Sequence, residues 1–338
     1  MNPIIQFGIQ LIQVFQKMSP ALDGLMKAFS FLGTIEFYLL LIPLLYWVVD
    51  VQLGMRVLLV LISTDFLGIA FKQLLHQPRP YWVGDVKPLA TETSYGIPSS
   101  HASDSLAVWG YLSYRLKKNW LWVVSALLVS LIAFSRMYLG VHFPQDVLGG
   151  WVIGLVVIIA FARGEAWALS WLKKLSAAGQ IAVGFGISIA MILIGQLVVV
   201  LIASFTDPAG WVQFSTEARS TSHYFTLAGA LFGTVAGFAL MWRHARFEMN
   251  GSWGQRAGRY IVGIAGVLIL YLALDVLFGL IAKDESMAGY LLRYIRYASV
   301  AFWATFGAPW TFLKAKLAQP VADTGASSTI EKGKPVPV

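Results

Sequence analysis

Long apolar segments follow one another along most of this chain and limit the folds that it can adopt. Of its 338 residues, 57% are hydrophobic and only 12% are charged, whereas charged residues make up about 25% of an ordinary soluble domain. A helix needs about 20 mainly apolar residues to cross the hydrocarbon core of a bilayer. The segments approach this length, and a helix satisfies its own backbone polar groups in lipid. They therefore predict an all-α fold, a polytopic membrane helical bundle.

We predict about nine spans from these segments. They are residues 37–49, 53–75, 98–114, 120–139, 147–162, 181–205, 224–242, 260–281 and 290–313. The first segment reaches spanning length only if it includes part of the preceding turn at 29–34.

The composition divides the chain into four parts. Residues 1–34 place apolar side chains at helical spacing among glutamines, which predicts N-terminal helices that lie at the membrane interface. Residues 35–163 contain the polar clusters described below and form the predicted core. Residues 164–317 add further transmembrane helices. Residues 318–338 are rich in Pro, Gly, Ser and Lys and form a predicted disordered tail.

Lys and Arg residues are distributed unevenly between the two ends of the predicted spans. If the N-terminus lies outside the cytoplasm, 15 of the 25 fall on the cytoplasmic side, as the positive-inside rule favours. They are Arg56, Arg115, Lys117, Lys118, Arg163, Lys173, Lys174, Arg243, Arg246, Arg256, Arg259, Lys314, Lys316, Lys332 and Lys334. The C-terminus would then be cytoplasmic. The net charge of +8 is attributed to these loops, and we expect no nucleic-acid partner.

A lysine and an arginine lie seven residues apart at the end of the second segment. Lys72 supplies a compact positive charge, and Arg79 supplies a planar fork of donors that suits phosphate oxygens. A single lysine near a membrane surface more often extends its amine towards water. Two fixed cations in a chain this apolar call for an anion, and we predict that they bind a phosphate.

The third segment begins with Pro98, Ser99, Ser100 and His101. Serines at such a position commonly cap a helix. The free N–H groups and the dipole at a helix N-terminus also bind anions, so capping and phosphate binding are compatible interpretations. His101 would then face the phosphate and act as a general acid.

The fourth segment contains a third cation near its end, and a histidine–aspartate pair follows the segment. Arg136 completes the set of cations. His142 precedes Asp146 by four residues, which is the minimal form of an oriented imidazole. We predict that His142 attacks phosphorus to form a phosphohistidine and that Asp146 orients its ring. The predicted topology places all three clusters on the extracytoplasmic face.

Together the clusters resemble the signature of the type 2 phosphatidic acid phosphatase (PAP2) superfamily. That signature reads Lys-x6-Arg-Pro, then Pro-Ser-Gly-His, then Ser-Arg-x5-His-x3-Asp. The first and third parts match, whereas Ser100 stands where the family usually has Gly. The resemblance covers roughly residues 22–160 and implies a PAP2-type core with additional C-terminal helices.

The resemblance also implies a role for each site residue. Phosphate ligands would be Lys72, Arg79, Ser99 and Arg136, and Ser100 adds a hydroxyl close to the phosphate. His101 would be the acid, His142 the nucleophile and Asp146 the residue that orients it. No metal and no other cofactor is expected, which agrees with the lack of a carboxylate cluster suited to Mg²⁺.

The implied activity is that of an integral membrane phosphatase, which would lie in the plasma membrane if the protein is bacterial. Its substrates would be phosphomonoesters or diphosphates of lipids, of the phosphatidate, phosphatidylglycerol phosphate, isoprenyl diphosphate or sphingoid phosphate type. We expect the 81–97 loop and the gaps between helices to select among them. The sequence assigns no oligomeric state.

Two other functions remain open. The run from Arg79 to Trp82, the nine spans and the topology are also similar to glucose-6-phosphatase, which acts on a sugar phosphate. A non-enzymatic lipid phosphate carrier or flippase would keep the fold without turnover. Such a protein would be expected to have lost His101, His142 or Asp146, and all three are present.

Two carboxylates lie within predicted spans, where an ionisable group is costly and therefore a candidate for function. Asp65 lies seven residues before Lys72 on the same helical face. It could support the site or form a bond to a neighbouring helix, and both interpretations stay open. Asp275 lies outside the core and receives no role.

Overall fold

The computed structural model describes residues 2–215 and 217–321, and their secondary structure is helical apart from one isolated bridge. The all-α prediction is therefore confirmed. The α-helices are α1 (Pro3–Gln16), α2 (Asp23–Phe31), α3 (Ile35–Leu44), α4 (Val51–Leu75), α5 (Pro80–Val83), α6 (Ser100–Leu116), α7 (Asn119–Tyr138), α8 (Pro144–Leu172), α9 (Ala177–Leu201), α10 (Val212–Ser215), α11 (Ser222–His244), α12 (Trp253–Gly279), α13 (Met287–Phe302) and α14 (Ala308–Lys314). Two π-helical segments, η1 (Leu45–Val49) and η3 (Trp303–Gly307), and a 3₁₀ turn, η2 (Glu217–Arg219), complete the set.

Each of the nine predicted segments coincides with a helix or with helices joined end to end, but nine spans are not confirmed. Among the residues that the structure describes, six stretches are long and apolar enough to cross a membrane: 51–83, 119–138, 144–172, 177–201, 222–244 and 253–279. The pair formed by α2 and by α3 with η1 would be a seventh, bent by 51°. Helix α6 has 17 residues and thus extends about 25 Å, short of the roughly 30 Å hydrocarbon core. Helix α13 has 16 residues, among them Arg293 and Arg296.

Side-chain caps fix where several of these helices begin. The Asp50 carboxylate accepts a hydrogen bond from the Leu53 N–H at 2.6 Å and opens α4. Ser176 caps α9 in the same way, through the Gly179 N–H at 3.1 Å. These acceptors satisfy N–H groups that the first turn of a helix leaves without partners.

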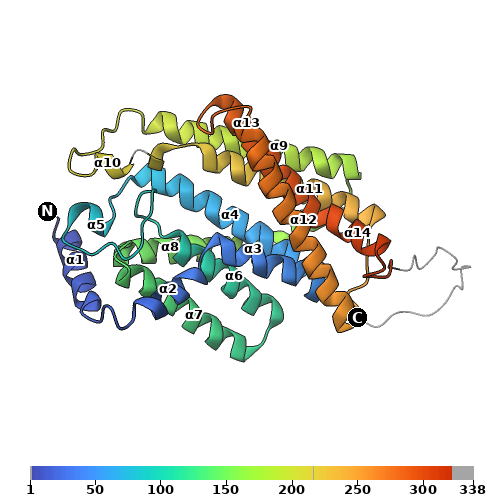
Figure 1. Cartoon of the computed structure of the whole chain (residues 1–338), viewed down its shortest axis with the longest axis horizontal. Coiled ribbons are helices and arrows are strands. Elements are labelled where there is room, and N and C mark those ends of the chain that lie inside the picture. The colour runs from blue at the N-terminus through green and yellow to red at the C-terminus, as the bar shows by residue number, and fades with distance from the viewer. Residues whose placement is uncertain (1, 216, 322–338) are drawn as a thin grey trace, which may run out of the picture.

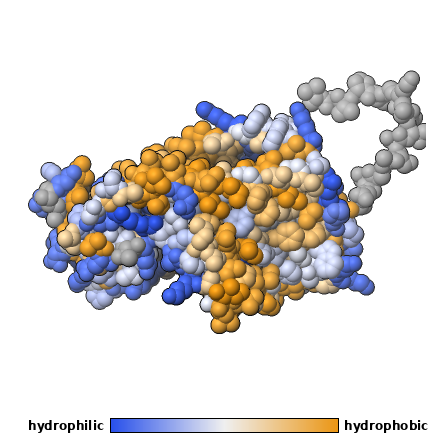
Figure 2. Space-filling view, turned by 90° about the horizontal axis from the view of Figure 1, so that it is seen from above, coloured by the Kyte–Doolittle hydropathy of each residue, from blue (hydrophilic) through white to orange (hydrophobic). Residues whose placement is uncertain are grey.

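Helix α4 forms the centre of the bundle. It packs against α6 and α8 on one side and against α9 and α11 on the other (Figure 1). Helices α1, α5 and α10 lie at one end of the long axis, and α14 lies towards the opposite end. Figure 2 shows apolar residues gathered over the middle of the visible face and hydrophilic residues at both ends. This distribution is the one expected of a protein that crosses a bilayer.

Three glycines allow α13 to approach α11 closely. Gly229, Gly233 and Gly237 recur every fourth residue, so they share one face of α11. A Cβ atom at Gly229 would collide with the backbone of Tyr294, and one at Gly233 with the backbone of Ala298. Small residues at this spacing are typical of helix contacts in membranes, where close backbone approach replaces the hydrophobic effect.

The division of the chain into four parts stays a prediction, and the structure shows what lies at two of its boundaries. Helix α8 runs through positions 163 and 164, where the core was expected to end. The predicted disordered tail lies outside the described residues from position 322 onward. Within 318–321, Gln319 accepts a hydrogen bond from the Glu248 N–H at 2.8 Å, and Ala318 is buried.

The close contact at Gly233 predicts that two matched glycine-to-alanine substitutions differ in their effect on stability. Gly233→Ala should destabilise the protein by about 1–3 kcal/mol, because the added methyl group pushes α13 away. Gly186→Ala should leave stability unchanged or slightly raised, since its Cβ would meet nothing within 4 Å and alanine favours a helix over glycine. Thermal unfolding of both variants in detergent measures the difference. Equal melting temperatures would contradict this role of the glycine face.

Candidate active site

The three motif clusters lie together at one end of the bundle because five structural elements end or begin there. Lys72 lies in the last turn of α4, Arg79 precedes α5, Ser99 precedes α6, Arg136 lies in the last turn of α7, and His142 and Asp146 flank the start of α8. Each of these six side chains is at most 3% exposed. Three cations are thus buried side by side, an arrangement that is costly unless other groups compensate the charge.

The start of α8 orients the His142 ring. Asp146 Oδ2 lies 3.2 Å from His142 Nδ1 and also accepts the Phe143 N–H at 2.8 Å. The second bond holds the carboxylate in place as part of the helix cap. This geometry suits the tautomer in which Nδ1 carries the proton and donates it to the carboxylate.

The other ring nitrogen of His142 faces an arginine. Nε2 lies 3.2 Å from Arg79 Nη1, and a guanidinium can only donate, so Nε2 presents its lone pair. Burial, followed by the positive charges of Arg79 and Lys72, holds the pKa of His142 well below its usual range. The imidazole is therefore neutral at neutral pH, the state that a nucleophile requires.

Backbone carbonyl groups of the 84–97 loop hold Lys72 and Arg79. The Tyr95 carbonyl accepts from both Lys72 Nζ and Arg79 Nη2, each at 3.2 Å. Arg79 also donates to the Ser94 carbonyl at 2.6 Å and to the Val141 carbonyl at 2.8 Å. These contacts fix the direction of both cations, and no motif in the sequence indicates them.

Ser99 occupies the N-cap position of α6 without capping it. Its N–H donates to the Asp146 carbonyl at 2.8 Å, but its hydroxyl makes no capping bond. Ser99 Oγ and His101 Nε2 are both buried, and neither has a hydrogen-bond partner among the described residues. Ser100 instead lies towards α4, where a Cβ at Gly68 would be 3.6 Å from its hydroxyl oxygen.

The N-terminal helices contribute two residues that sequence reasoning missed. Arg136 Nη1 donates to the Ser30 hydroxyl of α2. A Cβ at Gly33 would lie 3.0 Å from His101 Cδ2, so the segment after α2 packs directly on this histidine. Neither residue stands at a spacing that links it to the motifs.

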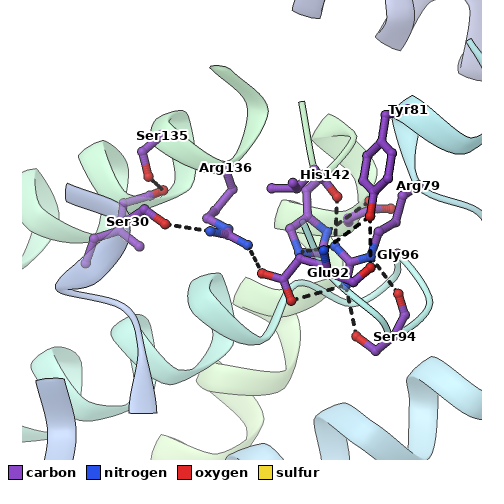
Figure 3. A network of polar contacts seen from close by, with 12 residues as sticks. Ser30, Arg79, Tyr81, Glu92, Ser94, Gly96, Ser135, Arg136 and His142 are labelled. Carbon is purple, nitrogen blue, oxygen red and sulfur yellow. Dashed lines mark hydrogen bonds and ion pairs between the residues drawn. The ribbon is translucent and has the colours of Figure 1, made fainter. Parts of the chain in front are cut away.

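Glu92, which the motif analysis also missed, lies between the two arginines. Its Oε1 accepts from Arg136 Nη2, and its Oε2 lies 3.9 Å from Arg79 Nη2. Figure 3 shows its carboxylate between Arg136 on one side and Arg79 with His142 on the other. Burial alone would raise the pKa of Glu92, but the charges of Arg79 and Arg136 outweigh it and lower the pKa to about 2.

The two carboxylates within the apolar segments have partners on other helices. Asp65 Oδ2 lies 2.9 Å from Nε2 of His223 at the start of α11, so its bond to a neighbouring helix is the one observed. Asp275 of α12 forms an ion pair with Arg296 of α13. Within residues 2–215 and 217–321, no three His, Asp or Glu side chains are grouped so that they could hold a metal ion.

A segment from the C-terminal half covers the loop that holds the cations. The Tyr95 hydroxyl donates to Asp207 at 3.0 Å, and Arg219 forms an ion pair with the same carboxylate at 2.9 Å. Trp82 and Trp211 stack with ring centres 5.5 Å apart. The connection between α9 and α11 is therefore fastened to the motif region by polar and aromatic contacts.

Comparison with known proteins supports the family that the motifs indicate. The PAP2 superfamily model matches residues 53–170, and the model for the PAP2 superfamily phosphatase transmembrane extension matches residues 225–320. The chain is 30% identical over 168 residues to lipid phosphate phosphatase delta of Arabidopsis thaliana, covering 45% of this chain and 40% of that protein. It is 30% identical over 151 residues to phosphatidylglycerophosphatase B of Bacillus subtilis, covering 41% of this chain and 72% of that protein.

A third relative is named for a sugar phosphate instead of a lipid phosphate. The chain is 28% identical over 147 residues to glucose-6-phosphatase catalytic subunit 1 of Haplochromis nubilus, covering 35% of this chain and 42% of that protein. The match thus spans about two fifths of the plant and fish relatives and most of the bacterial one. The resemblance drawn from the motifs is confirmed, and this chain belongs to the PAP2 superfamily.

Proposed function

We propose that the protein is an integral membrane phosphatase that hydrolyses lipid phosphomonoesters or diphosphates through a phosphohistidine. One observation carries the proposal. A neutral His142 is oriented by Asp146 through Nδ1 and presents the lone pair of Nε2 among three buried cations. A buried nucleophile next to fixed positive charge is suited to attack a phosphate group.

In the proposed reaction, positioning and charge stabilisation account for most of the catalysis. Lys72, Arg79 and Arg136 bind the phosphate oxygens, with Ser99 Oγ as a further donor. His142 Nε2 attacks phosphorus, the bond from phosphorus to the leaving oxygen breaks, and His101 gives that oxygen a proton. A water molecule then loses a proton to His101 and attacks the phosphohistidine, which releases inorganic phosphate and restores His142.

The substrate class is proposed from the relatives and from the setting of the site. Two of the relatives above are named for lipid phosphates. The site lies at the ends of α4, α7 and α8, helices long and apolar enough to lie in a bilayer. A lipid could keep its tails beside these helices while its phosphate reaches the cations. The fish relative keeps a sugar phosphate as the second candidate.

We also propose that the chain crosses the membrane nine times with the site on the extracytoplasmic face. Helix α1 and the site lie at one end of the bundle and α14 lies towards the other (Figure 1), as an odd number of spans requires. The excess of Lys and Arg at the end away from the site supports a cytoplasmic C-terminus.

Activity measurements test the reaction. Purified protein in detergent with EDTA should release phosphate from at least one of phosphatidate, undecaprenyl diphosphate, a sphingoid phosphate and glucose 6-phosphate. His142→Ala should abolish release, a loss on the order of 10⁴-fold or more, whereas His244→Ala, at an exposed histidine at the end of α11, should retain it. Loss of activity in EDTA would contradict the metal-free reaction. No release from any substrate by folded protein would favour a carrier.

Cysteine labelling tests the topology, because the chain contains no cysteine of its own. Asp85→Cys lies in the exposed part of the loop at the site end, and Lys174→Cys lies just beyond the far end of α8. In intact cells a membrane-impermeant maleimide should label the first variant and not the second. After permeabilisation it should label both. The reverse pattern would overturn the proposed orientation.

A further inference from the structure

Glu92 is the one carboxylate that forms ion pairs with both Arg79 and Arg136 within the described residues. Its side chain is 28% exposed, whereas the two arginine side chains are 1% and 3% exposed. The partly exposed Glu92 side chain therefore places its negative charge next to two arginines that are shielded from water.

The backbone of Glu92 is fastened, so this position is built into the loop. The Tyr81 hydroxyl of α5 donates to the Glu92 carbonyl at 2.8 Å and accepts from the Glu92 N–H at 3.2 Å. Two residues further along, Ser94 is bound to Arg79 through its carbonyl and its hydroxyl. Because the backbone is held at Glu92 and again at Ser94, the carboxylate is directed at the guanidinium groups.

We propose that Glu92 is an internal anion that competes with the substrate for Arg79 and Arg136 and thereby sets a charge threshold for binding. This inference rests on the proposed function, because it takes these arginines as phosphate ligands. Glu92 occupies Arg136 Nη2 and places its charge 3.9 Å from Arg79 Nη2, so a phosphate that binds both arginines meets this carboxylate. Substrate binding therefore includes displacement of the carboxylate, and a weakly charged anion fails to achieve it.

The threshold separates two kinds of lipid headgroup. A phosphomonoester carries a charge of about −1.5 to −2 at neutral pH and three acceptor oxygens. A phosphodiester carries a single charge and has an ester bond in place of one of those oxygens. Attraction to fixed cations scales with the charge of the ligand, so the monoester displaces a carboxylate that the diester does not. Phosphodiester lipids surround a membrane enzyme in large excess, and Glu92 would keep them off the cations.

A purely structural role for Glu92 predicts the opposite effect of its removal. If the carboxylate only held the two arginines in place, Glu92→Gln would let their side chains move out of position. Anions of every kind would then bind with equal or lower affinity. Competition predicts higher affinity for all of them, with the largest gain for monoanionic phosphodiesters.

The experiment compares wild type, Glu92→Gln and Asp85→Asn in mixed micelles. Asp85 lies on the same loop with an exposed side chain, so its substitution removes an equal charge away from the arginines. Phosphatidate hydrolysis is followed while phosphatidylglycerol, a monoanionic phosphodiester, replaces phosphatidylcholine. We expect Glu92→Gln to be half-inhibited at a mole fraction of phosphatidylglycerol about tenfold lower than wild type requires. Asp85→Asn should match wild type. Equal or weaker inhibition of Glu92→Gln would overturn the proposal.

A second readout does not depend on turnover. Inorganic phosphate should raise the melting temperature of Glu92→Gln at about tenfold lower concentration than that of wild type. This result would stand even if no lipid were hydrolysed, so it separates failure of the inference from failure of the proposed activity. If Glu92→Gln does not fold, Glu92→Asp decides, since its shorter side chain withdraws the charge from Arg136. The same shift in smaller degree would support competition, and no shift would refute it.

Discussion

The burial of three like charges in an apolar bundle is the constraint on which the rest of the site depends. Lys72, Arg79 and Arg136 would repel one another and lose hydration energy without partners. Carbonyl groups of the 84–97 loop, the Ser30 hydroxyl and the Glu92 carboxylate compensate for this loss. The loop between α5 and α6 therefore takes its shape largely from the cations that it surrounds.

The location of the helices and of the motif residues could be predicted because both depend on local sequence. Apolar length marked each helical segment, and fixed spacing marked the histidine–aspartate pair, whose geometry follows from the first turn of α8. The number of spans depends on how each helix compares with the thickness of the bilayer. Helix α6 is short and α13 carries two arginines, and hydrophobicity alone treated both as ordinary spans.

Contacts between distant segments could not be predicted in this way. Ser30 and Glu92 reach Arg136 from two different parts of the chain, and no spacing relates them. Asp65 meets His223 across 158 positions, so its partner was visible only in three dimensions. Ser99 shows a different limit. A serine at a helix start predicts a cap, whereas the hydroxyl here is buried and makes no capping bond.

Tyr95 joins the part of the chain that the PAP2 superfamily model matches to a connection that neither family model covers. Its carbonyl holds Lys72 and Arg79, while its hydroxyl is bound to Asp207 in the connection between α9 and α11. Evolution could therefore exchange residues in that connection, leaving every motif residue intact, and still alter how firmly the two cations are held. Two members of the superfamily with identical catalytic residues can therefore differ in affinity for phosphate through one contact outside the motifs, such as that between Tyr95 and Asp207. Comparison of the motifs alone would not reveal this difference.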